Sequence, residues 1–95
     1  MAVYFVVEIE IRDPETFAQY VERVPATVAS HGGRYLVRGG QISALEADWD
    51  PERLVIIEFP TREQFDVWAA SPEYKEVAKL RAASAKSRSL VVQGV

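Results

Sequence analysis

The first segment of the chain alternates between two sets of side chains from Val3 to Ile11. This period of two, with many β-branched and aromatic residues, predicts a β-strand. One set is entirely apolar, so we expect that side of the strand to face a hydrophobic core. The apolar set is Val3, Phe5, Val7, Ile9 and Ile11, and the opposite set is Tyr4, Val6, Glu8 and Glu10.

A helix is predicted directly after this strand. Asp13 has the side chain of a good N-cap, and Pro14 suits the first helical position. Apolar residues then recur at helical spacing and form one stripe. Gly32 and Gly33 end the helix, because glycine readily takes the left-handed conformation found at helix C-termini. The stripe consists of Phe17, Tyr20, Val21, Val24 and Val28.

The middle of the chain is predicted to be extended, and its connection allows two interpretations. Residues 34–38 predict a second strand and residues 42–47 a third extended piece. Between them, Gly39 and Gly40 fit either a tight hairpin turn or a bulge that bends one long strand. Residues 48–51, with Trp49 among them, predict a turn.

Residues 54–59 are the most apolar strand of the sequence, and Pro60 ends it. Thr61 and Gln64 then fit the capping box that starts a helix. We expect that helix to bury a stripe of three residues. They are Phe65, Trp68 and Ala69.

A further helix and a last strand complete the pattern. Ser71 followed by Pro72 starts a helix that runs to about residue 83, and residues 89–93 predict the final strand. The order is strand, helix, strand, strand, helix pair, strand. This order predicts a single α+β domain over residues 1–95, a ferredoxin-like split βαβ arrangement with helices on one face of an antiparallel sheet.

The other face of this sheet predicts a homodimer. Tyr4, Val6, Leu54 and Ile56 fall on it, which makes it too apolar to face water. No element of the chain remains to cover it. A second copy, related by a two-fold axis and packed sheet to sheet, is the simplest cover.

Composition narrows the possible partners. The chain has no cysteine, which excludes disulfides, thiolate chemistry and zinc sites that depend on cysteine. Eleven basic and fourteen acidic residues give a net charge of −3, which argues against nucleic acid as a partner. The apolar stretch at the N-terminus is too short to span a membrane, so we expect a cytoplasmic protein without membrane contact.

Three segments of the sequence resemble a known family. They are residues 32–40 (GGRYLVRGG), 58–60 (EFP) and 71–74 (SPEY), and they are similar to the family called domain of unknown function 1330. The resemblance implies a dimeric α/β barrel, in which two ferredoxin-like sheets pack face to face. It also implies a superfamily that includes cofactor-free monooxygenases, isomerases, dehalogenase-like proteins and relatives of chlorite dismutase. A shared fold does not determine a reaction.

Glu8, Arg38 and Glu58 are the leading candidates for chemistry. Both carboxylates fall on the face that dimerisation would bury, so each needs a partner. Arg38 is the nearest donor if Arg34, Leu36 and Arg38 share that face. Such a set fits either a buried ion pair that fixes the interface or a ligand contact with Glu58 as a general base.

His31 is the only histidine, so a histidine proton shuttle would have to use it. It falls in the last turn of a predicted helix, where it equally fits a contact with the helix carbonyls. One histidine and scattered carboxylates do not have metal-ligand spacing. We therefore expect neither a metal nor another cofactor.

The sequence supports two classes of function. The first is a small dimeric protein that binds an aromatic or carboxylate-bearing molecule, with or without cofactor-independent catalysis. Its pocket would lie between the sheet and the helices or inside the barrel. The second is a non-catalytic homodimeric interaction module whose charged residues only fix the interface. The predicted ligand-binding residues are Tyr4, Glu8, Tyr35, Arg38, Trp49, Arg53 and Tyr74.

Overall fold

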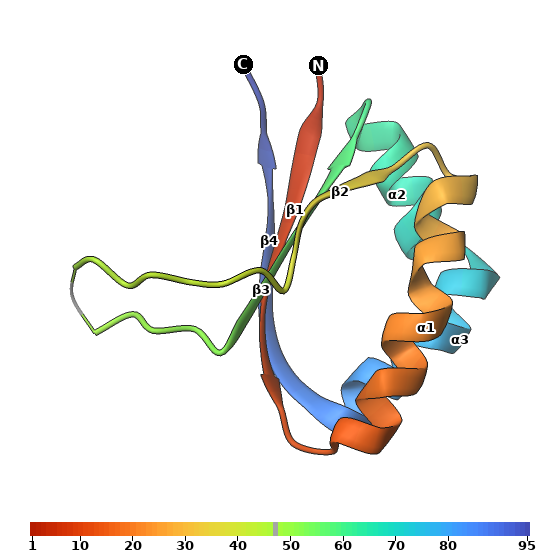
Figure 1. The fold of residues 1–95 in the computed structure, drawn as a ribbon. Helices are drawn as coiled ribbons and strands as arrows, with labels where there is room; N and C mark the ends of the chain where they lie inside the picture. The colour runs from red at the N-terminus through yellow and green to blue at the C-terminus, as the bar shows by residue number, and fades with distance from the viewer. Residues whose placement is uncertain (47) are drawn as a thin grey trace.

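Strands and helices follow one another in the predicted order in the computed structural model, which describes residues 1–46 and 48–95 (Figure 1). Their bounds are β1 Val3–Ile11, α1 Pro14–Ser30, β2 Arg34–Arg38, β3 Arg53–Phe59, α2 Arg62–Ala70, α3 Pro72–Ser84 and β4 Ala85–Gln93. The last strand begins at Ala85, directly after α3, and is therefore longer than the predicted strand over residues 89–93.

The strands form one antiparallel sheet in the order β2-β3-β1-β4. All three helices cover the same face of this sheet, and α1 packs beside α3 (Figure 1). This is the predicted α+β, ferredoxin-like arrangement. The other face of the sheet is left without a helix.

Side-chain caps start the helices where the sequence predicts them. Asp13 Oδ1 accepts a hydrogen bond from the Thr16 N–H at 3.3 Å. Thr61 Oγ1 accepts one from the Gln64 N–H at 3.1 Å. Each cap satisfies an N–H group that has no partner within its own helix.

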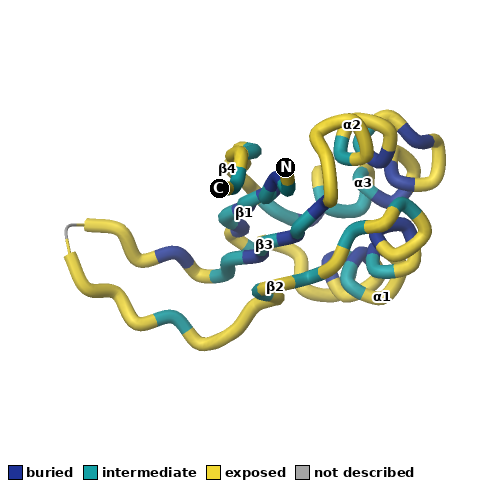
Figure 2. Tube along the Cα trace, turned by 90° about the horizontal axis from the view of Figure 1, so that it is seen from above, coloured by how far each residue is buried: buried dark blue, intermediate teal, exposed yellow. Residues whose placement is uncertain are grey.

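The hydrophobic core lies between the sheet and the helices, where the buried stretches of the chain gather in Figure 2. Most helix-facing residues of β1 and β3 are buried, and Ile11 at the end of β1 is half-buried. Aromatic rings fill the α2 end of the core, with the Trp68 centroid 5.1 Å from that of Phe59. The buried sheet residues are Val3, Phe5, Val7, Ile9, Val55, Ile57 and Phe59.

A β-bulge in β2 corrects the prediction for the middle of the chain. Tyr35 lies opposite Ile57 and Val37 lies opposite Ile56, so Leu36 is the extra residue. Neither proposed role of Gly39 and Gly40 is observed, because the bulge lies before them and no hairpin turn joins two strands there.

The described residues between β2 and β3, 39–46 and 48–52, are mostly exposed and extend away from the helices (Figures 1 and 2). No strand forms over residues 42–46, contrary to the prediction, and Ala47 lies outside the described residues. Separately, no helix in the described part of the chain is long and apolar enough to cross a membrane.

The helix-free face of the sheet carries an apolar row that crosses every strand. The row runs Val37, Ile56, Val6, Leu90 in the order of the strands. Ion pairs flank it at opposite corners, Arg34 with Glu58 on one side and Arg88 with Glu8 on the other. We call this surface the open face.

A buried hydrogen bond between α1 and α2 gives a test of the core. Trp68 Nε1 donates to Thr27 Oγ1 at 3.1 Å, and that hydroxyl donates to the Val24 carbonyl at 2.8 Å. We expect Thr27→Val to lower the free energy of unfolding by about 1–3 kcal/mol, because it leaves the Trp68 N–H buried without an acceptor. Chemical denaturation measures this. In a Trp68→Phe background the same substitution should cost clearly less; an equal cost would show that the hydrogen bond is not the cause.

Candidate functional site

A small cavity of about 20 Å³ lies between the sheet and α1. Its volume is enough for about one water molecule. The lining is mainly apolar, and its polar groups come from tyrosine and arginine side chains. The lining residues are Phe5, Val7, Ile9, Phe17, Tyr20, Val21, Val24, Tyr35, Arg38, Arg53, Val55 and Ile57.

Arg38 contacts the helix layer at a carbonyl that a proline leaves free. Pro25 lies inside α1 and has no N–H, so the carbonyl of Val21, four residues earlier, lacks its usual helical donor. Arg38 Nη2 donates to that oxygen at 3.0 Å. The guanidinium also lies over the ring of Tyr35, 5.1 Å from its centroid. The helix proline therefore supplies an acceptor that holds Arg38 at the cavity.

Arg53 lies at the first position of β3, with its guanidinium carbon 5.5 Å from the centroid of the Phe17 ring. Its Nε is buried and has no hydrogen-bond partner among the described residues. Gly39 lies against this guanidinium so closely that a Cβ would collide with it, and its φ of 69° also favours glycine. The Gly39 N–H donates to the Leu54 carbonyl at 3.0 Å, which fixes the close approach.

Three tyrosines border the cavity and the space behind it. Tyr20 and Tyr35 line the cavity, and Tyr74 of α3 is a neighbour of Tyr20. Burial raises the pKa of Tyr35, although the positive charges of Arg38 and Arg53 oppose this rise. Burial is also the main cause that raises the pKa of Tyr20. Both phenols are therefore protonated at neutral pH and can donate hydrogen bonds.

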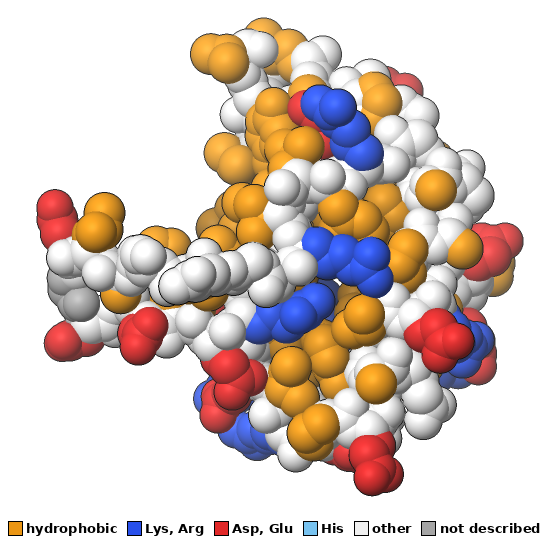
Figure 3. Space-filling model, viewed as in Figure 1, with side chains coloured by type: hydrophobic (Ala, Val, Ile, Leu, Met, Phe, Trp, Pro, Cys, Tyr) orange, Lys and Arg blue, Asp and Glu red, His pale blue; other side chains and the backbone are white. Residues whose placement is uncertain are grey.

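Among the described residues, the arginines at this site have no carboxylate partners. Figure 3 shows basic side chains beside the hydrophobic surface between the sheet and α1, with no acidic side chain between them. Arg38 and Arg53 take part in none of the ion pairs of the described residues. Those pairs are Arg34–Glu58, Arg62–Asp66, Lys79–Glu76 and Arg88–Glu8.

The predicted pairing of Arg38 with Glu8 or Glu58 is wrong. Glu58 instead accepts from Arg34 Nε at 2.6 Å, and Glu8 accepts from Arg88 Nη2 at 2.6 Å. The bulge at Leu36 is the reason, since one extra residue turns the rest of a strand to its other face. Arg34 therefore lies on the open face, and Arg38, opposite the buried Val55, lies on the helix side.

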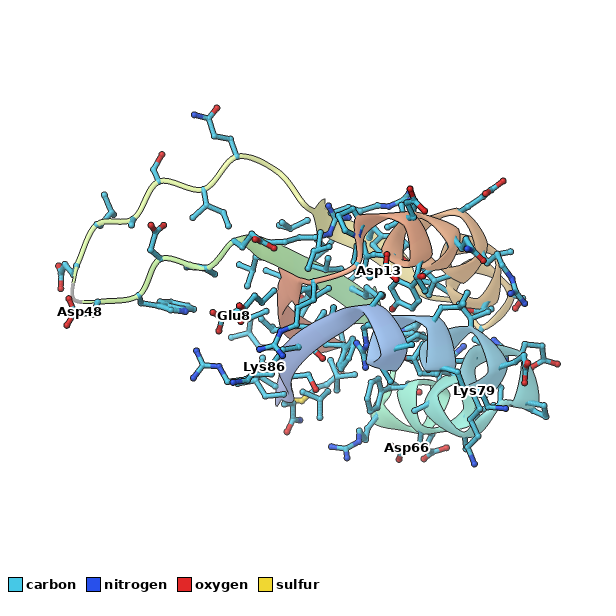
Figure 4. The ribbon with its side chains drawn as sticks, turned by 90° about the horizontal axis from the view of Figure 1, so that it is seen from below. Glu8, Asp13, Asp48, Asp66, Lys79 and Lys86 are labelled. Atoms are coloured by element: carbon cyan, nitrogen blue, oxygen red, sulfur yellow. The ribbon has the colours of Figure 1, made fainter. Side chains whose placement is uncertain are left out.

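The predicted site residues fall into separate places. Tyr35, Arg38 and Arg53 come together at the cavity. Tyr4, Glu8 and Glu58 lie on the open face, and Figure 4 shows Glu8 on the side of the sheet away from the helices.

The remaining predicted residues lie outside the cavity lining. Tyr74 is buried behind Tyr20 and stacks on Trp68 with centroids 3.9 Å apart. His31 is the C-cap of α1, where its Nδ1–H donates to the Thr27 carbonyl at 2.8 Å.

Trp49 is exposed between β2 and β3 and borders a separate, open groove of about 280 Å³ on the open face. A second copy packed on that face would contact this groove. The groove therefore bears on assembly more than on ligand binding.

The sequence did not indicate that Phe17 and Tyr20 line the cavity. Both belong to the apolar stripe of α1, which is the pattern expected of core residues. One signal was present in the sequence. Pro25 inside a helical stripe implies a free carbonyl at Val21, and such a carbonyl attracts a donor. Nothing in the sequence indicates which arginine supplies it.

The described residues offer no metal site. Among them, no three histidine, cysteine, aspartate or glutamate side chains lie close enough together to hold a metal ion. The donor groups at the cavity are cationic guanidinium and neutral phenol groups, which suit an anion.

Comparison with known proteins places the whole chain in one family. The family model described as domain of unknown function (DUF1330) matches residues 2–95. A comparison with curated proteins finds no match.

Solved structures show the same fold at low sequence identity. A protein of unknown function from Rhodopseudomonas palustris, RPA0582, superposes with a TM-score of 0.80 at 19% identity, over 99% of this chain and 82% of that one. SnoaB, a cofactor-independent oxygenase from Streptomyces nogalater, gives 0.73 at 20%, over 99% and 93%. A dimeric ferredoxin-like protein of unknown function from Jannaschia sp. CCS1 gives 0.70 at 13%, over 99% and 100%.

Two double-mutant cycles test the separation of the two faces. Arg34→Met and Glu58→Gln should show a coupling of up to about 1 kcal/mol, because this ion pair is partly exposed to solvent. Arg38→Met and Glu58→Gln should add to within about 0.5 kcal/mol, because the two side chains lie on opposite sides of the sheet. Denaturant unfolding of the variants measures both. A strong coupling of Arg38 to Glu58 would contradict the position of the bulge.

Proposed function

This chain belongs to the DUF1330 family, and from that premise we propose that it is a homodimer that binds a small organic acid with an apolar or aromatic body. The acid would lie between the sheet and α1. Its carboxylate would contact Arg38 and Arg53, and its body would contact the apolar lining and the ring of Tyr35.

One observation carries this proposal. Arg53 Nε is buried beside an apolar cavity and has no acceptor among the described residues. A buried donor without a partner is destabilising, and donors of charged groups more so. A carboxylate can accept two parallel hydrogen bonds from a guanidinium, so it matches the group that lacks a partner.

The size of the cavity sets a condition on binding. About 20 Å³ holds a water molecule and not an aromatic acid, so α1 or its side chains would have to move outward when the acid enters. The backbone of α1 lies against α3, and mainly side chains fill the space between α1 and the sheet. Rotation of those side chains would therefore enlarge the cavity without breaking a strand pairing.

The chemistry available at the cavity supports catalysis without a cofactor. Two guanidinium groups and protonated phenols would stabilise negative charge that develops on a substrate oxygen. The similarity of the fold to that of SnoaB, a cofactor-independent oxygenase, is compatible with such a role. Glu58 and His31, the predicted acid–base residues, would act only on a ligand outside this cavity.

The alternative, a non-catalytic interaction module, is favoured by the open face. Its carboxylates Glu8 and Glu58 are each paired within the chain, so these charges could serve the interface alone. Binding of an acid at Arg38 and Arg53 would distinguish the ligand-binding protein from the interaction module.

The homodimer is testable through the apolar row of the open face. We expect the wild-type chain to have twice its monomer mass of 10.7 kDa in light scattering. Ile56→Asp should yield monomer or insoluble material, because it would bury an unpaired charge at the centre of the row. Val67→Asp is the control, since Val67 is a 60% exposed apolar residue of α2 on the helix layer. A monomeric wild type would refute the dimer, and equal effects of both substitutions would refute the interface.

Ligand binding is testable with simple acids such as benzoate and phenylpyruvate. At a concentration of about 100 times Kd, an acid should add about 2.7 kcal/mol to the free energy of unfolding and raise the Tm. Arg38→Met and Arg53→Met should abolish this shift because they remove the carboxylate donors. Arg34→Met is the matched control, since it removes an arginine of the same strand from the opposite face. If no acid raises the Tm, or if the shift survives in both variants, the proposed site is wrong.

A further inference from the structure

Two buried guanidinium N–H groups lack hydrogen-bond partners in the described part of the chain. One is Nε of Arg53 and the other is Nη1 of Arg81. Every unsatisfied buried donor requires an explanation, since folding removes it from water without replacing its acceptor. The proposed carboxylate site accounts for Arg53 and leaves Arg81 unexplained.

Both groups lie beside one pair of touching rings on α1. The guanidinium carbon of Arg53 is 5.5 Å from the centroid of Phe17, and that of Arg81 is 6.0 Å from the centroid of Tyr20. The two ring centroids are 5.5 Å apart. Each ring of this pair therefore has one cation beside it, Arg53 from β3 at Phe17 and Arg81 from α3 at Tyr20.

Among the described residues, Arg81 takes part in no ion pair. Its guanidinium lies beside the ring of Tyr20, and Tyr74 is a further neighbour of Tyr20. Tyr20 lines the cavity and has Arg81 beside its ring, so this side chain connects the cavity to Arg81. The ligand itself would then have to provide the hydrogen-bond acceptor for Arg81.

We propose that the ligand of this site carries two anionic groups, one at each end of an apolar body. One group would bind Arg38 and Arg53, and the other would bind Arg81 together with the Tyr20 hydroxyl. This inference rests on the proposed function, because it extends the same cavity toward α3. The ligand class is therefore a compact dianion, such as an aromatic dicarboxylate, and Arg81 determines the preference for it over a monoacid.

The test compares two probes, benzoate and isophthalate, which share a ring and differ by one carboxylate. Their Kd values are measured by calorimetry at matched ionic strength. Wild-type protein should bind isophthalate at least tenfold more tightly than benzoate. Arg81→Met should bring this ratio near one and leave the Kd for benzoate unchanged. Arg53→Met should weaken both probes.

Lys79→Met is the matched control, because it removes an exposed positive charge from the same helix. It should leave the tenfold ratio intact. Arg81→Gln provides a second variant that keeps hydrogen bonding and loses the charge, and it should also lower the ratio if Arg81→Met does not fold.

The outcomes separate this inference from the proposed function. If benzoate binds through Arg53 and isophthalate binds no tighter, the second anionic position is refuted and the proposed function stands. A preference that survives Arg81→Met and Arg81→Gln also refutes it. If neither probe binds the wild type, the proposed function and this inference both fail.

Discussion

The bulge at Leu36 is the local feature on which the rest of the site depends. Without the extra residue, Arg34 and Arg38 would fall on the same face of the sheet, since side chains alternate with a period of two. With it, Arg34 pairs with Glu58 on the open face while Arg38 contacts α1. One residue thus divides two like charges between the faces of the sheet: Arg34 forms an ion pair on the open face, and Arg38 lies at the cavity without an ion pair to any described residue.

The fold could be predicted from the sequence, and the site only in part. Alternation in β1 and β3, together with caps such as Asp13 and Thr61, are local signals, and each specified its element correctly. The bulge is not local in this sense, because its position depends on how β2 pairs with β3. Arg53 and Tyr35 were predicted as ligand residues from their chemical type, and Arg38 was predicted for the wrong face.

Arg53 carries an energetic cost that folding alone does not explain, because part of its guanidinium is buried. Replacing buried charged groups with apolar residues of similar volume is often neutral or stabilising. Arg38, by contrast, is exposed, and it gains the Val21 carbonyl, which Pro25 leaves free, and the Tyr35 ring as partners. Arg53 receives a cation–π contact with Phe17 and no acceptor for Nε among the described residues. A ligand that supplies the missing acceptor is therefore the simplest reason for this arrangement.

The same strands serve both faces, so the proposed ligand binding and the proposed assembly would be linked. Val37 contributes to the apolar row of the open face, and Arg38, the next residue, contacts the cavity. On β3, likewise, Leu54 lies on the open face, and Arg53, the preceding residue, contacts the cavity. A partner copy that fixes Val37 and Leu54 would also fix the backbone that carries both arginines. By thermodynamic reciprocity, a ligand that orders the arginines would then strengthen the dimer by the same factor by which the dimer strengthens ligand binding.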